Sequence, residues 1–246
     1  ARGADYVCFT GSTGTGRQVA RLAADRLVGC SLELGGKNAL YVRADAPLEL
    51  AVDVALRSAF AAGGQVCAHT ERLVVHDDIA DAFVPRFLEA VQGMRLGVAL
   101  DYGYDMGSLF GPDQLQRVGD HVRDAVLHGA RVLTGGRARP DLGPWVYEPT
   151  VLDGVTAAMD VRDAETFGPV VSIYRVRDDE AALTADIVRL AKQYGRYGYR
   201  RVRQLLVDEG WRVSVKRDMR DKPLEPQVMK SIRVETFGQT YPFEQM

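Results

Sequence analysis

Short apolar runs alternate with amphipathic helical segments along residues 5–176, and this alternation limits the fold more than any other feature. The first run, residues 5–11, ends at a glycine turn, and Val19, Leu22 and Leu27 then follow at helical spacing. Further strands are expected at 72–76, 131–136 and 169–176, two short strands around a Gly-Gly break in 30–42, and helices at 47–62, 79–94 and 112–130. Strands alternating with helices predict an α/β fold with a largely parallel sheet.

The helical segments carry their own local signals. Pro47 is expected at the start of the helix over 47–62, because proline fits the first helical turn. The helix over 112–130 is amphipathic. Its expected buried face consists of Leu115, Val118, Val122 and Val126.

The composition favours a soluble globular protein of the cytoplasm. Hydrophobic residues make up 46% of the 246-residue chain and charged residues 26%. No apolar run reaches the length of a membrane span, and residues 1–11 lack the pattern of a signal peptide. Three cysteines indicate free thiols in a reducing compartment, and four scattered histidines without a CxxC motif argue against a metal site.

Cys67, in "GGQVCAHTERL" (63–73), has two interpretations. A free cysteine is most often a small buried apolar residue. The alternative is a nucleophile. Gly63 and Gly64 would let a ligand approach the backbone closely, and a helix start or nearby polar donors would favour the thiolate.

Glu33 also has two interpretations. It lies in the apolar setting "SLELGGKN" (31–38), where desolvation would raise its pKa toward the range that a general base needs. The alternative, slightly favoured by the local sequence alone, is a structural glutamate held in a salt bridge.

Four motifs together resemble the aldehyde dehydrogenase superfamily. They are the glutamate signature "LELGGKNA" (32–39), the cysteine signature "FAAGGQVCAHTER" (60–72), the cofactor turn "GSTGTG" (11–16) and the later cofactor motif "ETFGPVV" (165–171). The spacing of 34 residues between Glu33 and Cys67 is the family's usual one. The resemblance covers residues 1–180, about the middle third of a complete family enzyme.

The resemblance implies oxidation of a small-molecule aldehyde to a carboxylic acid with NAD(P)+. The Cys67 thiolate attacks the aldehyde to give a thiohemiacetal, and its backbone N–H stabilises the oxyanion. Hydride passes to the cofactor, and Glu33 activates the water that hydrolyses the thioester. By motif, Gly11, Ser12 and Gly16 border the pyrophosphate, Glu165 binds the nicotinamide ribose, Phe167 packs beside the ring, and Leu34 and Gly35 line the nicotinamide end.

Within the family, residues 100–118 and 135–155 are most similar to bacterial succinate-semialdehyde dehydrogenases, so succinate semialdehyde is the expected substrate. Ala61 weakens this assignment, because some of these enzymes carry an arginine there for the substrate carboxylate. His69 departs from the family, which generally has a small residue two positions after the cysteine. Its imidazole would stabilise the thiolate, crowd the substrate or point to solvent, and steric disturbance is the expectation.

The chain changes character in its last quarter. From residue 186 onward it has 13 Lys and Arg against 8 Asp and Glu, whereas the rest is acidic. Residues 186–217, basic, aromatic and of helical pattern, resemble the helix-turn-helix segment of insertion-sequence transposases, which implies weak DNA binding through arginines on phosphates. The alternative is a solvated basic helix that is packed by its aromatic residues.

The expected organisation has four parts: a remnant of the cofactor-binding domain (1–34), a partial catalytic domain (35–180), a helix-turn-helix-like segment (181–220) and an irregular tail (221–246). Against the family pattern, the early strands of the cofactor domain, an oxyanion-hole asparagine and an adenosine-ribose lysine are missing. The strand used by these homo-oligomeric enzymes for assembly is missing too. The competing hypothesis is therefore an inactive truncated remnant, a chimera of a dehydrogenase and a mobile element.

Overall fold

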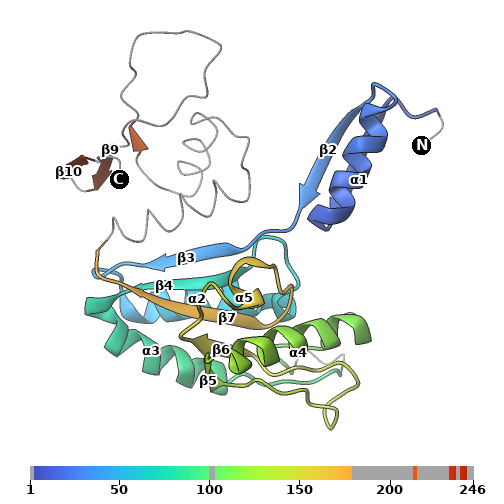
Figure 1. Ribbon diagram of the computed structural model, residues 1–246. Helices are drawn as coiled ribbons and strands as arrows, with labels where there is room; N and C mark the ends of the chain where they lie inside the picture. The colour runs from blue at the N-terminus through green and yellow to red at the C-terminus, as the bar shows by residue number, and fades with distance from the viewer. Residues whose placement is uncertain (1–2, 100–102, 179–212, 215–232, 237–238, 243–246) are drawn as a thin grey trace. The chain divides into compact units, whose positions relative to one another are not determined.

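The computed structural model describes residues 3–99, 103–178, 213–214, 233–236 and 239–242 (Figure 1). It divides into two compact units, residues 1–179 and 180–246. The first unit contains a two-stranded and a five-stranded sheet, and the second contains a three-stranded sheet. Among the described residues, no helix is long and apolar enough to cross a membrane.

The chain begins with a strand, a helix and a second strand. β1 (Tyr6–Gly11) and β2 (Gly29–Leu34) pair in parallel, and α1 (Thr13–Ala24) connects them. Gly16 of α1 lies against Leu34 of β2, so closely that a Cβ on Gly16 would be 2.5 Å from a Leu34 methyl. This contact fixes which alternate residues of β2 face the helix.

The larger sheet has the order β3-β4-β7-β6-β5. Its strands are β3 (Asn38–Val42), β4 (Thr70–His76), β7 (Val170–Val176), β6 (Thr150–Asp153) and β5 (Arg131–Thr134). All neighbours pair in parallel except β5, which is antiparallel at the edge. The predicted α/β fold with a largely parallel sheet is confirmed.

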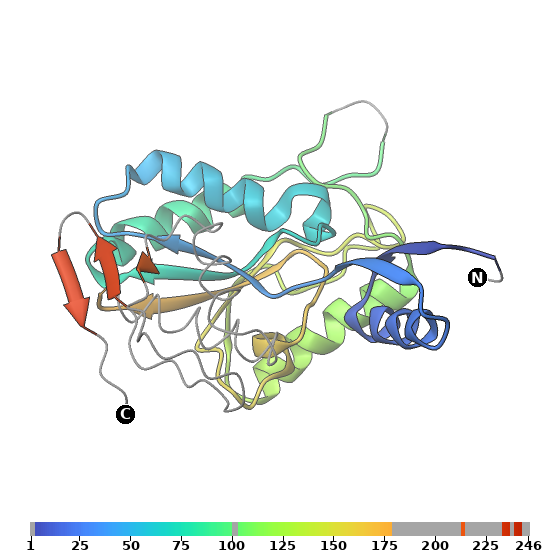
Figure 2. The same ribbon diagram turned by 90° about the horizontal axis from the view of Figure 1, so that it is seen from above.

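Helices cover both faces of this sheet (Figures 1 and 2). α2 (Leu48–Phe60), followed by the short 3-10 helix η1 (Ala61–Gly64), and α3 (Asp77–Gln92) pack on one face. α4 (Pro112–Leu127) and α5 (Asp160–Asp163) pack on the other. Consecutive residues of β6 therefore serve different cores: Val151 packs with α2 and α3, and Leu152 with α4 and α5.

Several expectations about the helices were wrong in detail. α1 begins at Thr13, inside the glycine motif, and ends at Ala24, so Leu27 lies beyond it. Leu22, Leu27 and Val126 are exposed. In α4, Ala125 takes the buried position expected for Val126. The sequence pattern did not reveal β6, α5 or η1, which are each only four residues long.

In the second unit, β9 (Arg233–Thr236) pairs antiparallel with β10 (Gln239–Pro242) and with β8 (Val213–Ser214). The tail over 221–246 therefore includes a paired hairpin. The helical expectation for 186–217 is wrong at Val213–Ser214, which form a strand. The other residues of that segment lie outside the described residues.

Candidate active site

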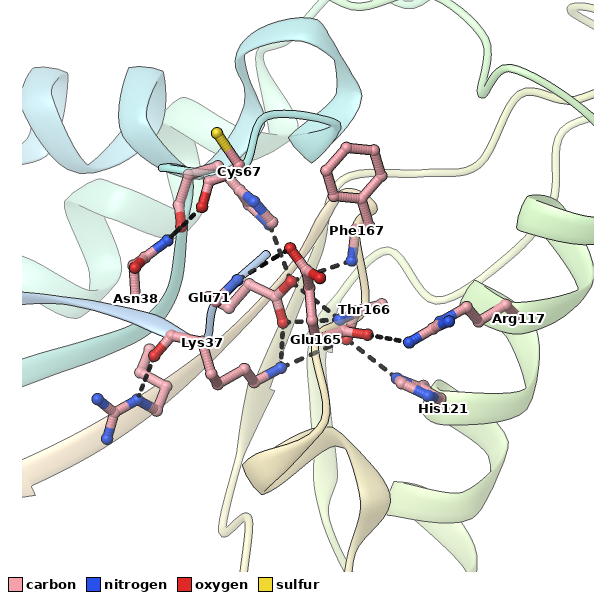
Figure 3. Close-up of polar contacts among 12 residues, drawn as sticks. Lys37, Asn38, Cys67, Glu71, Arg117, His121, Glu165, Thr166 and Phe167 are labelled. Carbon is pink, nitrogen blue, oxygen red and sulfur yellow. Dashed lines mark hydrogen bonds and ion pairs between the residues drawn. The ribbon is translucent and has the colours of Figure 1, made fainter. Parts of the chain in front are cut away.

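Three loops meet at the amino ends of β3, β4 and β7 (Figure 3). Lys37 precedes β3, Cys67 precedes β4, and the segment Glu165–Phe167 precedes β7. Because these strands are parallel neighbours in the order β3-β4-β7, the loops that enter them lie on one edge of the sheet. The sheet thereby gathers residues that are far apart in the sequence.

Cys67 lies in a tight turn between η1 and β4. The turn is closed by a bond from the His69 N–H to the Val66 carbonyl at 3.0 Å. The Asn38 side-chain amide donates to the carbonyl oxygens of Cys67 at 2.8 Å and His69 at 3.2 Å. The thiol is exposed, so Cys67 is not a buried apolar residue. Cys67 does not begin a helix, so one of the two settings expected to favour a thiolate is absent at this position.

Gly64 does not leave room for a ligand, because it is packed against another loop. Gly63 and Gly64 are both buried, and both have left-handed backbones, with φ of 66° and 69°. A Cβ on Gly64 would lie 2.1 Å from the Gly168 carbonyl oxygen. Gly64 therefore lets the cysteine loop pack directly against the loop that precedes β7.

Glu33 is exposed on β2, opposite Thr10 of β1. The expected apolar setting is wrong, because Leu32 and Leu34 lie on the half-buried side of β2, where Leu34 meets α1, and Glu33 points the other way. No hydrogen bond or ion pair joins Glu33 to another described residue. Within the described part of the chain, no hydrogen bond thus joins Glu33 to Cys67.

The glycine motif forms the start of α1. Ser12 is its N-cap, and its Oγ accepts a bond from the Thr15 N–H at 3.2 Å. Gly11, the last residue of β1, pairs in register with Leu34, and Gly16 is buried against the same leucine. The structure brings these predicted cofactor residues together at the carboxyl ends of β1 and β2.

Glu165 lies beside the Gly-Gly break that follows β2. Its Oε1 accepts a bond from the Gly36 N–H at 3.2 Å. A Cβ on Gly35 would lie 1.9 Å from the Glu165 carboxylate, so this approach requires glycine. Burial raises the pKa of Glu165, and the bond from Gly36 opposes that shift. Phe167 is half-buried and has a left-handed backbone with φ of 54°.

The sequence reasoning missed a buried ion pair below these loops, between Lys37 and Glu71. The Lys37 ammonium also reaches the Thr166 hydroxyl at 3.4 Å. Burial favours a higher pKa for Glu71. The charges of Lys37 and His69 outweigh that effect, and the pKa lies below its ordinary value. The available signal was a glutamate in the strand "TERLVVH", which continues as the apolar run 73–75, since a buried charge requires a partner.

His69 is buried and does not point to solvent. Its Nδ1 lies 2.7 Å from the Val66 carbonyl, and its Nε2 lies 3.3 Å from Glu71 Oε1. Burial lowers the pKa of this imidazole, although the Glu71 carboxylate opposes the shift. Nε2 makes no hydrogen bond to another described residue, so the ring is bonded to the cysteine turn and lies beside Glu71 without a bond to it. The expected steric disturbance of the substrate is not what this buried position indicates.

α4 presents three further polar residues to the same loop. Gln114, Arg117 and His121 are spaced by three and four residues, which places them on one helix face. Gln114 donates to the Thr166 and Phe167 carbonyls, Arg117 to the Glu165 carbonyl, and His121 Nδ1 lies 3.1 Å from the Thr166 hydroxyl. The sequence signal for this face was the recurrence of polar residues at helical spacing, three and four positions apart. Across the described residues, no group of three or more His, Cys, Asp or Glu could hold a metal ion.

Comparison with known proteins gives a family match over most of the chain. The aldehyde dehydrogenase family model matches residues 1–188. A Mycobacterium ulcerans protein, provisionally named succinate-semialdehyde dehydrogenase [NADP(+)] 2, is 51% identical over 179 residues, which are 73% of this chain and 35% of the relative. The chain thus spans about a third of the length of the curated relatives that it matches.

Solved structures agree with this match. Succinate-semialdehyde dehydrogenase from Burkholderia pseudomallei superposes with a TM-score of 0.70 at 36% identity, covering 74% of this chain and 37% of that one. Betaine aldehyde dehydrogenase from Staphylococcus aureus, solved with NAD+, gives a TM-score of 0.70 at 33% identity and covers 36% of that chain.

Proposed function

Because the chain belongs to the aldehyde dehydrogenase family, we propose that it carries the catalytic chemistry of NAD(P)+-dependent oxidation of an aldehyde to a carboxylic acid. The observation that carries this proposal is the exposed Cys67 thiol on a turn whose carbonyl oxygens accept hydrogen bonds from the Asn38 amide. The backbone of the cysteine loop meets the loop of Glu165 and Phe167 at Gly64 and Gly168. A nucleophile and a cofactor segment are thus neighbours.

The residues present fit a nicotinamide dinucleotide. The first turn of α1, a twelve-residue helix capped by Ser12, offers backbone N–H groups to a pyrophosphate. Glu165 is a half-buried carboxylate anchored by Gly36, which suits the hydroxyl pair of a ribose. Phe167 supplies an aromatic surface for the nicotinamide end, together with Leu34 and Gly35.

The chain's own groups act in two stages. The Cys67 thiolate adds to the aldehyde carbon, and the backbone N–H of Cys67 donates to the oxygen that becomes negative. When bound, NAD(P)+ supplies the acceptor for the hydride that leaves the thiohemiacetal. Glu33 then removes a proton from the water that hydrolyses the resulting thioester, which frees the acid and restores the thiol.

The proposed substrate is succinate semialdehyde, with NADP+ as the preferred cofactor. The name of the M. ulcerans relative mentions both the substrate and NADP(+). The name of the B. pseudomallei enzyme mentions the substrate. Ala61 is exposed in η1, so the substrate carboxylate requires a cation other than the arginine that some of these enzymes place there.

The test is aldehyde-dependent formation of NAD(P)H by the full chain and two variants. Cys67→Ala removes the nucleophile, and we expect a loss on the order of 10⁴-fold in kcat/KM. Glu33→Gln keeps the nucleophile but removes the base, so we expect a burst of NAD(P)H followed by turnover slowed by about 10²–10⁴-fold.

The matched controls are Cys8→Ala, which removes another exposed thiol, and Glu89→Gln, which removes another exposed carboxylate. Both should keep wild-type rates. If the wild-type chain forms no NAD(P)H with any aldehyde and binds neither cofactor, the competing hypothesis of a non-catalytic remnant is supported instead.

A further inference from the structure

Phe167 has a backbone conformation that a bulky residue rarely adopts. Its φ of 54° lies in the left-handed region. Such a conformation persists only where the surrounding structure enforces it. Gly168, which follows, is packed so closely that a Cβ there would lie 2.4 Å from a Val118 methyl. The segment that contains two proposed cofactor residues is therefore strained.

One side of the Thr166–Phe167 segment is held by Glu71 of β4. Glu71 Oε1 accepts from the Thr166 N–H at 2.9 Å and from the Phe167 N–H at 3.0 Å, and Oε2 also lies 3.0 Å from the Thr166 nitrogen. Glu71 is fully buried and is paired with Lys37. Hydrogen bonds to an ionised acceptor in such a place are among the strong ones in proteins.

The other side is held by Gln114 of α4. Its Nε2 donates to the Thr166 carbonyl at 2.8 Å and to the Phe167 carbonyl at 2.7 Å. One carboxylate and one amide thus bind all four backbone polar groups of two consecutive residues. These two side chains come from a strand and a helix on different sides of the segment.

We infer that Glu71 and Gln114 are positioning residues that clamp the Thr166–Phe167 backbone and so hold Glu165 and Phe167 in place for the cofactor. The inference rests on the proposed function for the cofactor roles of Glu165 and Phe167. The Glu71 carboxylate also lies beside the ring of His69, which bonds to the turn that carries Cys67.

The first test is Gln114→Met, which removes both amide bonds, keeps the length of the side chain and leaves no charge unpaired. We expect backbone amide exchange at Thr166 and Phe167 to accelerate about tenfold and the Kd for NADP+ to rise about tenfold. Alkylation of Cys67 by iodoacetamide and the KM for the aldehyde should stay at wild-type values. A general loss of structure would change all four quantities.

The matched control is Gln116→Met, the same substitution two positions along the same helix. Gln116 is exposed and bonds to Asp120 one turn along α4, and no hydrogen bond joins it to the segment among the described residues. The Gln116→Met substitution should leave amide exchange at Thr166 and Phe167 and the affinity for NADP+ unchanged. A second variant, Lys37→Met with Glu71→Gln, removes the charged side of the clamp without leaving a buried lysine unpaired, and should change the same two quantities.

The inference is overturned if both folded clamp variants keep wild-type exchange at Thr166 and Phe167 and wild-type NADP+ affinity. Failure of the proposed function gives a different result. In that case wild-type protein binds no NADP+, yet amide exchange at Thr166 and Phe167 still reports whether the clamp exists.

Discussion

The β1–α1–β2 segment and the five-stranded sheet carry different parts of the proposed chemistry and are packed very differently. In α1 only Gly16 and Ala23 are buried, and the alternate residues of β2, including Glu33, are exposed. In the larger sheet, β4 and β7 are buried over most of their length. An isolated pair of strands is only marginally stable, whereas a larger sheet that is covered on both faces is stable by itself.

This difference shows that similar residue types have different consequences in the two regions. Glu33 and Glu71 are both glutamates on parallel strands, but the first is exposed and the second is paired with Lys37 inside the protein. Gly16 and Gly64 both mark close approaches, but the first meets a side chain and the second meets backbone. Stability should therefore depend on the five-stranded region.

The largest expected effect comes from removing a carboxylate in each region. Glu71→Ala leaves Lys37 buried without a partner and two backbone N–H groups unsatisfied, so we expect a loss of about 3–5 kcal/mol in the free energy of unfolding. Glu33→Ala should change it by less than about 0.5 kcal/mol, as for an exposed residue. Urea denaturation followed by circular dichroism measures both. Equal losses would mean that the two regions are packed alike.

Adding a methyl group to each close glycine should give the next largest difference. Gly64→Ala forces a Cβ to 2.1 Å from the Gly168 carbonyl at a left-handed position, so we expect a loss of about 2–4 kcal/mol. Gly16→Ala meets only the end of the Leu34 side chain and gains helix propensity, so the change should stay under about 1 kcal/mol. The same denaturation curves decide this, and a larger loss for Gly16→Ala would contradict the comparison.

The smallest expected effect concerns pH. The pKa of Glu71 is lower in the folded state, so its contribution to stability is complete above the ordinary glutamate pKa of 4.5 and is lost as the pH falls through the lower folded-state value. Between neutral pH and pH ~3, wild type should therefore lose more of its free energy of unfolding than the Lys37→Met/Glu71→Gln double variant, which lacks this carboxylate. Denaturation at a series of pH values tests this, with parallel curves as the contradicting result.

Much of the fold followed from local pattern. The strands at β1, β2, β3, β4, β5 and β7 and the four long helices were all expected, because strand and helix periodicities are visible in short windows. The pattern was less informative where elements are short, as for β6, or where exposure depends on a neighbour, as for Val126. The burial expected for Glu33 was wrong for the same reason, since its local setting is apolar but its side chain faces away from α1.

The sequence by itself determined the alternation of strands and helices, the family and the identity of the residues proposed for chemistry, Cys67 among them. Only the tertiary structure decided that Glu71 and Gln114 hold the segment before β7, and that Gly64 meets Gly168. The physical reason is the strand order, which places β7 beside β4 and joins residues 95 positions apart. A short stretch of sequence indicates whether a residue lies in a helix or a strand. The partner of a buried polar group, however, depends on which elements pack against it in the folded protein.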